Sequence, residues 1–445
     1  MHSALTHSST WHTCAHAIIY VVMKYFGTDG IRGIVGTDLN RHLIVKIARG
    51  IAKFIHKHKL KKLVLIANDT RTSSHFISSI IESVLLEHGI EIHDVGEISS
   101  PGLAYLTHRY NYPLSIMISA SHNLANYNGI KLFNHNGEKL SNTQEIEIER
   151  YMDSRITLHK SYAIKRYMHS LQTAYINHLR TILNTSTPAI FDCANGATSH
   201  IVKSLFNKSK KINCSPTGTN INQDSGCTHL DKLCMECSKQ NMIGFAFDGD
   251  GDRVMMVDES GTIIDGDKLL FILSIFYLHI GDKLIGTIYS NEGLKQSLKQ
   301  RNISLIRADV GDKNVYQKMC ELGCDLGGEK SGHIIVKKYA NTGDGILTAI
   351  LILNILNHTQ IPIKKLLENY QEFHQEYLNI RLDKISLNCY DNIIKNIDQE
   401  NSRIIIRPSG TEPLLRIMVE NKNKNTSKIL IEKIKDTIMK QQKNE

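Results

Sequence analysis

Residues 63–93 read LVLIANDTRTSSHFISSIIESVLLEHGIEIH, which is a strand pattern, a helical pattern and a second strand pattern in succession. Leu63–Ile66 is a short apolar run, Phe76–Leu86 repeats apolar residues at helical spacing, and Ile90–His93 again has the pattern of a strand. Because two strands joined by a helix pack best as a right-handed βαβ unit, this succession predicts a mostly parallel sheet with helices on both faces.

The same alternation extends on both sides of this stretch. A helical pattern from Ile44 to Ile55 precedes it and the apolar run Leu114–Ile118 follows it, so the first unit has a βαβαβ pattern. Two similar units come next, and the tail differs, with three strands and a long final helix. The expected strands of these later parts are 188–192, 211–214 and 243–247, then 284–288, 304–307 and 333–336, and finally 378–382, 403–406 and 415–420, before a helix over 427–440.

These patterns predict an α/β fold of three similar α/β domains with mixed sheets, plus a smaller C-terminal α+β domain, around a central cleft. A polypeptide of 445 residues is too long for one ordinary core. The expected boundaries are 23–165, 166–267, 268–372 and 373–445. Residues 1–22 hold four histidines and the only tryptophan but no Lys or Arg. We expect a disordered or non-native extension there, with a His-rich metal-binding tail as the alternative.

The composition excludes several classes of function. Hydrophobic residues make up 41% and charged residues 22% of the sequence, as in soluble globular proteins, and no apolar run approaches ~18 residues, so we expect no membrane partner. The net charge of +9 is dispersed along the sequence, which suits a small anionic substrate better than a nucleic acid. Nine cysteines without a secretory signal indicate a reducing, cytoplasmic location.

The most informative motif is Phe247-Asp248-Gly249-Asp250-Gly251-Asp252-Arg253. Carboxylates at alternate positions of a glycine-rich turn can converge on one small hard cation, and Mg²⁺ takes few carboxylates with phosphate or water in its other positions. Arg253 would reach a phosphate beside that ion. A calcium-binding EF-hand loop is the alternative, with Glu259 at its twelfth position, but its sixth position requires glycine and holds Arg253, and the flanks have strand patterns.

A second motif, Ile118-Ser119-Ala120-Ser121-His122-Asn123, follows an apolar strand. Open α/β sheets place their chemistry at the carboxyl ends of strands, so Ser121 is a candidate nucleophile that His122 would position or deprotonate. Taken alone, the motif is equally compatible with an ordinary hydrogen-bonded loop. A hydrolase triad is disfavoured because no G-x-S-x-G sequence surrounds the serine.

Three further loops carry groups that suit a phosphorylated sugar, although each alone is compatible with a plain turn. The loop 407–413 combines arginine, hydroxyls and glycine as in a phosphate clamp, the loop 327–333 offers groups that bind sugar hydroxyls or shuttle a proton, and the loop 27–33 offers an arginine. The four predicted domains each contribute a loop, as an active site between domains requires. The residues concerned are Arg407, Ser409, Gly410, Thr411 and Arg416; Glu329, Ser331 and His333; and Arg32.

Together and in this order, the five loops resemble the α-D-phosphohexomutase superfamily over essentially all of 23–445. The branch that the sequence most resembles is that of the bacterial phosphoglucosamine mutases. The supporting stretches are KYFGTDGIRG at 24–33, ISASHN at 118–123 and GEKSGH at 328–333. One departure is Leu124, where the serine loop of the superfamily usually has proline; this loosens the turn but removes no reacting group.

The resemblance implies a role for each residue. Ser121 is expected to be carried as a phosphoserine whose oxygen completes the coordination of one Mg²⁺ per active site. The other implied roles are metal binding by Asp248, Asp250 and Asp252; acid–base chemistry by Lys131, in the stretch NGIK, and His333; contact with the transferring phosphate by Arg32 and Arg253; sugar binding by Glu329 and Ser331; and binding of the idle phosphate by Arg407, Ser409, Gly410 and Thr411.

The implied reaction interconverts glucosamine 6-phosphate and glucosamine 1-phosphate through a 1,6-bisphosphate, feeding UDP-N-acetylglucosamine synthesis. A small phosphosugar is then the partner, and the protein is expected to be a monomer or homodimer. Two alternatives stay open, a phosphomannomutase/phosphoglucomutase and a non-catalytic sugar-phosphate-binding protein of the same fold.

Overall fold

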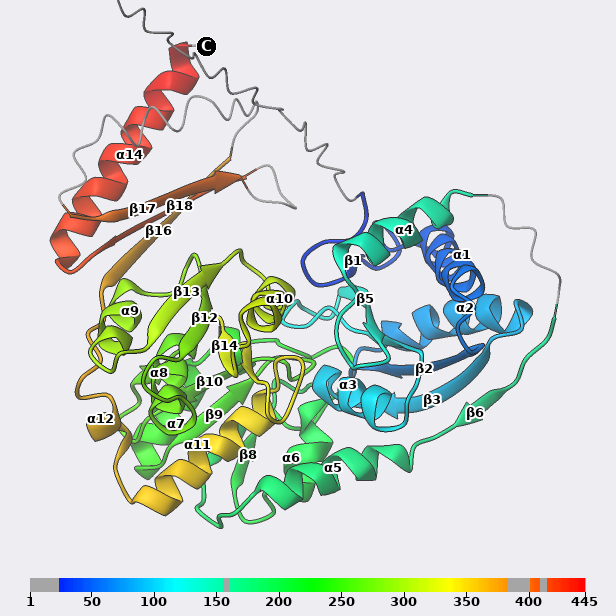
Figure 1. The fold of residues 1–445 in the computed structure, drawn as a ribbon, viewed down its shortest axis with the longest axis horizontal. Coiled ribbons are helices and arrows are strands. Elements are labelled where there is room, and N and C mark those ends of the chain that lie inside the picture. Colours follow the sequence, from blue (N-terminus) through cyan, green and yellow to red (C-terminus); the bar gives the residue numbers. More distant parts are fainter. Residues whose placement is uncertain (1–23, 155–160, 382–400, 409–413, 445) are drawn as a thin grey trace, which may run out of the picture.

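The computed structural model describes residues 24–154, 161–381, 401–408 and 414–444, so the predicted extension at 1–22 lies outside the described residues. Four sheets follow one another along the sequence (Figure 1). Among the described residues, no helix is both long and apolar enough to cross a membrane.

The first sheet has the order β1-β5-β4-β2-β3-β6. Its centre is parallel, as the strand–helix–strand pattern predicts, while β5 runs antiparallel to both β1 and β4. Helix α1 packs on the sheet because Ile44, Ile47 and Ile51 lie on one face and are fully buried. The strands are β1 (Ile31–Ile34), β2 (Leu63–Asn68), β3 (Glu91–Glu97), β4 (Leu114–Ile118), β5 (Tyr127–Asn134) and β6 (Lys165–Tyr167), and the helices are α1 (Arg41–Lys57), α2 (Ser73–Glu87), α3 (Ser100–Arg109) and α4 (Asn142–Met152).

The second and third sheets are also mixed, with the orders β11-β10-β9-β7-β8 and β13-β12-β14-β15. The second contains β7 (Ile190–Asp192), β8 (Lys210–Ile212), β9 (Gly244–Phe247), β10 (Val254–Val257) and β11 (Ile263–Ile264), with α5 (Leu171–Ile182), α6 (Thr198–Leu205) and α7 (Asp231–Gln240). The third contains β12 (Lys283–Thr287), β13 (Ser304–Ala308), β14 (Leu326–Gly328) and β15 (Ile334–Val336), with α8 (Gly266–Tyr277), α9 (Glu292–Lys299), α10 (Asp312–Leu322), α11 (Gly345–Thr359) and α12 (Ile363–Leu366).

The last sheet, β16-β18-β17, is antiparallel throughout and is covered by one long helix. Its elements are β16 (His374–Arg381), β17 (Arg403–Pro408), β18 (Leu414–Asn421) and α14 (Lys424–Asn444). The predicted fold class, three α/β units with mixed sheets and a C-terminal α+β unit, is therefore confirmed.

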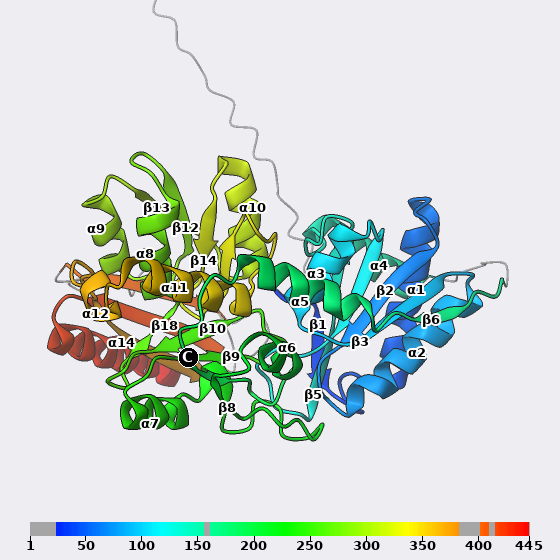
Figure 2. The same cartoon turned by 90° about the horizontal axis from the view of Figure 1, so that it is seen from below.

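The apolar cores show which units are packed together. One continuous apolar core joins the first three units and includes the buried residues of α11, a helix that lies against α8 and β10 (Figure 2). The C-terminal unit has a separate core between its sheet and α14, which includes Leu415, Ile417 and Leu430. Because interior packing resists small displacements, the first three units form one body, while the fourth is attached to it mainly through polar contacts.

Candidate active site

The three aspartates of the glycine-rich motif lie in the turn between antiparallel strands β9 and β10. All three side chains are buried, and one oxygen from each lies within 4.8 Å of the others. The turn closes on Asp248, whose Oδ1 accepts hydrogen bonds of 3.1 Å from the backbone N–H groups of Gly251 and Arg253. Gly251 has a φ of +75°, a left-handed conformation that glycine adopts without strain. The convergence expected from the motif is present.

Ser121 lies directly against this turn. Its Oγ donates a 2.5 Å hydrogen bond to Asp248 Oδ2, and its N–H donates to Ser119 Oγ at 2.9 Å. Ser121 has a φ of +51°, which for a residue with a side chain costs on the order of 1–3 kcal/mol and is retained only where the surroundings impose it. His122 Nδ1 is 3.5 Å from the serine oxygen, and burial with the nearby Arg253 and Arg32 lowers the pKa of His122 to about 3. Asp248 is therefore the closer partner of the serine hydroxyl.

A buried arginine that the sequence analysis missed holds the serine loop. The Arg71 side chain forms an ion pair with Asp69 at 2.9 Å and donates hydrogen bonds to the backbone C=O groups of Ser121 at 3.0 Å and Asn123 at 2.7 Å. It also donates to the C=O of Leu124, the position where we expected a looser turn. From the second unit, Asn222 Nδ2 donates to the C=O groups of Ser121 and Asn123, each at 2.8 Å. The loop is thus fixed from both units.

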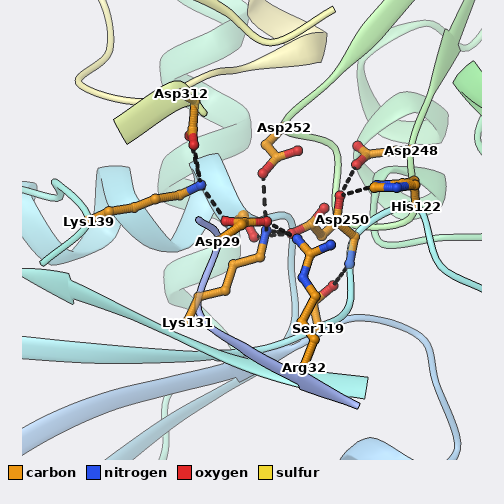
Figure 3. Close-up of polar contacts among 12 residues, drawn as sticks. Asp29, Arg32, Ser119, His122, Lys131, Lys139, Asp248, Asp250, Asp252 and Asp312 are labelled. Carbon is orange, nitrogen blue, oxygen red and sulfur yellow. Dashed lines mark hydrogen bonds and ion pairs between the residues drawn. The ribbon is translucent and has the colours of Figure 1, made fainter. Parts of the chain in front are cut away.

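Two cations compensate the aspartate charges. Lys131, on β5 and 1% exposed, lies 2.7 Å from Asp250 Oδ2 and 3.1 Å from Asp252 Oδ2 (Figure 3). His333 Nε2 lies 3.0 Å from Asp252 Oδ1 and its Nδ1 2.9 Å from Glu329 Oε2. Burial alone would lower the pKa of His333, but Asp252 raises it to about 9, so the imidazole carries a proton.

These two cations give the carboxylates of the turn different pKa values. Burial alone would raise the pKa of Asp252, but Lys131 and His333 lower it well below its ordinary value. Burial and then the charges of Asp252 and Asp250 raise the pKa of Asp248. Asp248 is consequently the carboxylate of the turn whose charge is least compensated by the protein.

The turn fits a divalent cation. Asp250 Oδ1 is buried and has no hydrogen-bond partner among the described residues, although buried carboxylate oxygens are normally bonded. The three carboxylates lie close together and beside a serine hydroxyl. Such hard oxygen ligands are those that Mg²⁺ prefers. The chemistry of the donor set therefore agrees with the magnesium expected from the sequence.

A second group that the sequence analysis missed bridges the first and third units. Lys139 forms ion pairs with Asp29 and, at 2.7 Å, with Asp312 at the start of α10 (Figure 3). Asp29 also pairs with Arg32 and lies 2.8 Å from Lys131 Nζ. The side chains of Lys139, Asp29 and Asp312 are only 8%, 12% and 4% exposed. A buried row of charges thus runs from the aspartate turn to the third unit.

A cavity of about 420 Å³ opens above these groups and is lined from all four units of the fold. Predicted site residues make up much of its wall, and Arg407 and Arg416 lie side by side there because they are paired across β17 and β18. Ser121, Lys131 and the three aspartates are buried and do not line the cavity, but Lys131 and Asp252 contact the wall residues Asp29 and His333. The predicted residues in the wall are His122, Arg253, Glu329, Ser331, His333, Arg407 and Arg416. Ser409, Gly410 and Thr411 lie outside the described residues.

Comparison with known proteins gives consistent matches along the sequence. Models of the phosphoglucomutase/phosphomannomutase alpha/beta/alpha domains I, II and III match residues 23–158, 165–261 and 265–373, and the model of the C-terminal domain matches residues 364–437. A phosphoglucosamine mutase of Oceanobacillus iheyensis is 38% identical over 426 residues, covering 90% of this chain and 95% of that protein.

Solved structures share the fold. A phosphoglucomutase/phosphomannomutase family protein of Burkholderia thailandensis superposes with a TM-score of 0.80 at 20% identity, covering 95% of this chain and 97% of that one. An N-acetylphosphoglucosamine mutase of Aspergillus fumigatus, solved in complex with GlcNAc-6P and magnesium, superposes with a TM-score of 0.64 at 14% identity, covering 94% and 95%.

Proposed function

Because the protein belongs to the phosphoglucomutase/phosphomannomutase family, we propose that it is an isomerase that interconverts glucosamine 6-phosphate and glucosamine 1-phosphate. The relative from Oceanobacillus iheyensis is a phosphoglucosamine mutase, and the match extends over nearly the whole of both proteins. The activity needs a site that binds a phosphosugar between domains, and a cavity lined from all four units supports it.

One observation carries the mechanism, the 2.5 Å hydrogen bond from Ser121 Oγ to Asp248 Oδ2. It places a hydroxyl held at a left-handed φ beside three converging carboxylates. Ser121 is the residue that carries the phosphoryl group in our proposal. Asp248, Asp250 and Asp252 would hold Mg²⁺, which when bound neutralises charge on the phosphoryl oxygens during transfer.

In the forward direction, the phosphoryl group passes from Ser121 to the 1-hydroxyl of glucosamine 6-phosphate. The P–Oγ bond breaks as the bond from phosphorus to the sugar oxygen forms, and a bound 1,6-bisphosphate results. Lys131 and His333, both within 3.1 Å of Asp252, are assigned to proton transfer. Both begin the step protonated. One of them gives its proton to Ser121 Oγ as the P–Oγ bond breaks and, being neutral then, takes the proton that the 1-hydroxyl releases. Arg32 and Arg253 bind the transferring phosphate.

The bisphosphate then turns within the cavity, and Ser121 takes the phosphate from the 6-position. Glu329 and Ser331 contact the sugar, while Arg407, Ser409, Gly410 and Thr411 hold the phosphate that is not reacting. The separate core of the C-terminal unit supports a movement of this clamp, with a hinge near residues 373–378. Apart from the transfer through Ser121, the protein contributes to catalysis mainly by positioning the substrate and stabilising charge.

Replacing the serine tests this mechanism. Ser121→Ala should abolish turnover in a coupled assay while the far-UV circular dichroism stays that of the wild type, because the lost hydroxyl is a reacting group. Ser204→Ala, on the exposed face of α6, is the matched control and should keep full activity. A Ser121→Ala protein with a near-normal rate would show that phosphate does not pass through this residue.

Metal and substrate are tested separately. Asp250→Ala should abolish the Mg²⁺-dependent activity. Wild-type turnover that persists in excess chelator would contradict the metal assignment. Glucosamine 6-phosphate, glucose 6-phosphate and mannose 6-phosphate, compared at equal concentration, should show the highest kcat/KM for the amino sugar. A preference for either neutral sugar would favour a phosphomannomutase/phosphoglucomutase instead.

A further inference from the structure

Tyr289 is a residue of the cavity wall to which neither the motifs nor the proposed reaction assigns a role. It lies in the loop between β12 and α9, and its ring is half-buried. The backbone of this loop is fixed, because Ser290 N–H donates to Thr287 C=O at 2.9 Å and Tyr289 C=O accepts from Gln375 Nε2 at 3.0 Å. The tyrosine side chain is therefore presented to the cavity from a firm support.

That side chain contacts the C-terminal unit at one of its proposed clamp residues. Arg407 Nε donates a 2.9 Å hydrogen bond to Tyr289 Oη, and the guanidinium carbon lies 5.2 Å from the centroid of the tyrosine ring. A second aromatic ring, that of Tyr377, lies 6.2 Å from Tyr289 and lines the same cavity. A hydrogen bond and a cation–π contact thus act together on the guanidinium group.

The attachment of the C-terminal unit itself uses other contacts. Arg403 donates to the backbone C=O groups of Ile288 at 2.6 Å and Ser290 at 2.9 Å, on either side of Tyr289. Glu292 N–H donates to the buried Glu420 at 3.0 Å. These bonds reach the loop through its backbone and do not depend on the tyrosine ring or hydroxyl. Removing the tyrosine hydroxyl therefore acts on Arg407 and leaves these docking contacts in place.

We propose that Tyr289 is a positioning residue that holds Arg407 facing the cavity before a phosphosugar arrives. The inference rests on the proposed function, in which Arg407 binds the phosphate that is not reacting. An arginine side chain has many rotamers, and ordering it costs binding free energy unless the order is already present in the free protein. Tyr289 supplies that order from the third unit, across the boundary over which the clamp moves.

The experiment is a double-mutant cycle on steady-state kinetics with glucosamine 6-phosphate as the varied substrate. Tyr289→Phe, which keeps the ring and removes the acceptor, should raise KM about 3- to 10-fold, the size of the net contribution of one typical hydrogen bond. The value of kcat should stay within about twofold, because the clamp binds ground state and transition state alike. Tyr289→Leu, which also removes the ring, should raise KM further. Tyr167→Phe, at a residue that is 70% exposed, is the control.

The Arg407→Lys background separates positioning from direct contact with the sugar. Arg407→Lys should itself raise KM at least about 10-fold, because lysine does not reproduce the forked donors. Adding Tyr289→Phe to it should then change KM by less than about twofold. The inference is overturned if Tyr289→Phe leaves the wild-type KM unchanged, if it lowers kcat in place of raising KM, or if it raises KM equally in the Arg407→Lys background.

The proposed function fails in a different way. A wild-type protein without mutase activity on any hexose 6-phosphate would overturn the reaction itself. An Arg407→Lys protein with a normal KM would overturn the clamp assignment, and the positioning role of Tyr289 with it.

Discussion

Replacing Asp344 by asparagine should make the protein less sensitive to rising pH. Asp344 precedes α11, is 4% exposed, and accepts hydrogen bonds from Leu347 N–H at 2.9 Å and from Tyr175 Oη at 2.8 Å. The next residue, Gly345, donates its N–H to Gly251 of the aspartate turn at 3.0 Å. Burial raises the pKa of Asp344 from 3.8 to about 6 against these hydrogen bonds. The carboxylate therefore supports the active site, and the free energy of burying it depends on pH because it ionises.

The sign and size follow from linkage. Because the pKa of Asp344 is higher in the folded than in the unfolded protein, the associated stability is fully present below pH 3.8 and is lost as pH rises through about 6. The rise of the pKa from 3.8 to about 6 corresponds to about 3 kcal/mol in total, of which on the order of 1 kcal/mol is lost between about pH 5 and pH 7.5. Asparagine does not ionise and caps a helix as well as aspartate does.

Urea unfolding at pH 5, 6 and 7.5, followed by far-UV circular dichroism, measures the effect. The stability of Asp344→Asn minus that of the wild type should rise by on the order of 1 kcal/mol across this range, while other titrating groups cancel in the difference. Asp436→Asn, on the exposed face of α14, should show no such change because its carboxylate stays in water. A flat difference for Asp344→Asn, or one that falls with pH, would refute the linkage argument and the buried carboxylate it rests on.

Three other substitutions probe the supports of the site. Arg71→Lys should lower kcat at least about 10-fold without unfolding the protein, because an ammonium group does not reproduce the hydrogen bonds that fix the serine loop. An unchanged kcat would contradict this expectation. Arg109→Lys, on the surface, is the control. Lys139→Met should lower the free energy of unfolding by about 3 kcal/mol, because Asp29 and Asp312 lose their ion pairs with Lys139. Adding Asp312→Asn should recover part of this loss. A loss below about 0.5 kcal/mol would show that the bridge is not needed for stability. Gly196→Ala should raise the Mg²⁺ concentration that gives half-maximal activity, because a Cβ at 196 would lie 2.3 Å from Gly249 O in the aspartate turn; an unchanged Mg²⁺ requirement would exclude that coupling.

Local patterns in the sequence were sufficient for the helices expected at 44–55, 76–86 and 427–440, for the central strands and for the aspartate turn. The helix expected from Ile44 to Ile55 is α1, which begins earlier, at Arg41, because Asn40 caps it through Leu43 N–H. The aspartate turn was predictable because alternate carboxylates and glycines leave a pattern within seven residues. The antiparallel strand β1 was not predicted, since four residues, IRGI, carry too little periodicity and their partner β5 lies far along the sequence.

The residues that hold the site in place, Arg71 and Lys139, could not be predicted from a local sequence pattern. Arg71 acts on backbone C=O groups, so nothing in the residue types of the serine loop points to it. The bridge through Lys139 joins residues 110 and 173 positions away, which become neighbours only when the units pack together. His122 was the expected helper of Ser121 because it is adjacent in sequence, whereas the carboxylate of Asp248 makes the shorter contact.

The serine loop and its partner carboxylate also differ in when they are made. Ser121 and the arginine that holds its loop belong to the first unit, whereas Asp248 follows 127 residues later. At about 5–20 residues per second, a ribosome needs roughly 6–25 s to cover that interval. During this time the emerging polypeptide can order its serine but has no aspartate turn to set against it. The aspartate turn that phosphate transfer requires is therefore present only after elongation past β10, and a polypeptide that stops earlier has the serine without its partner carboxylate.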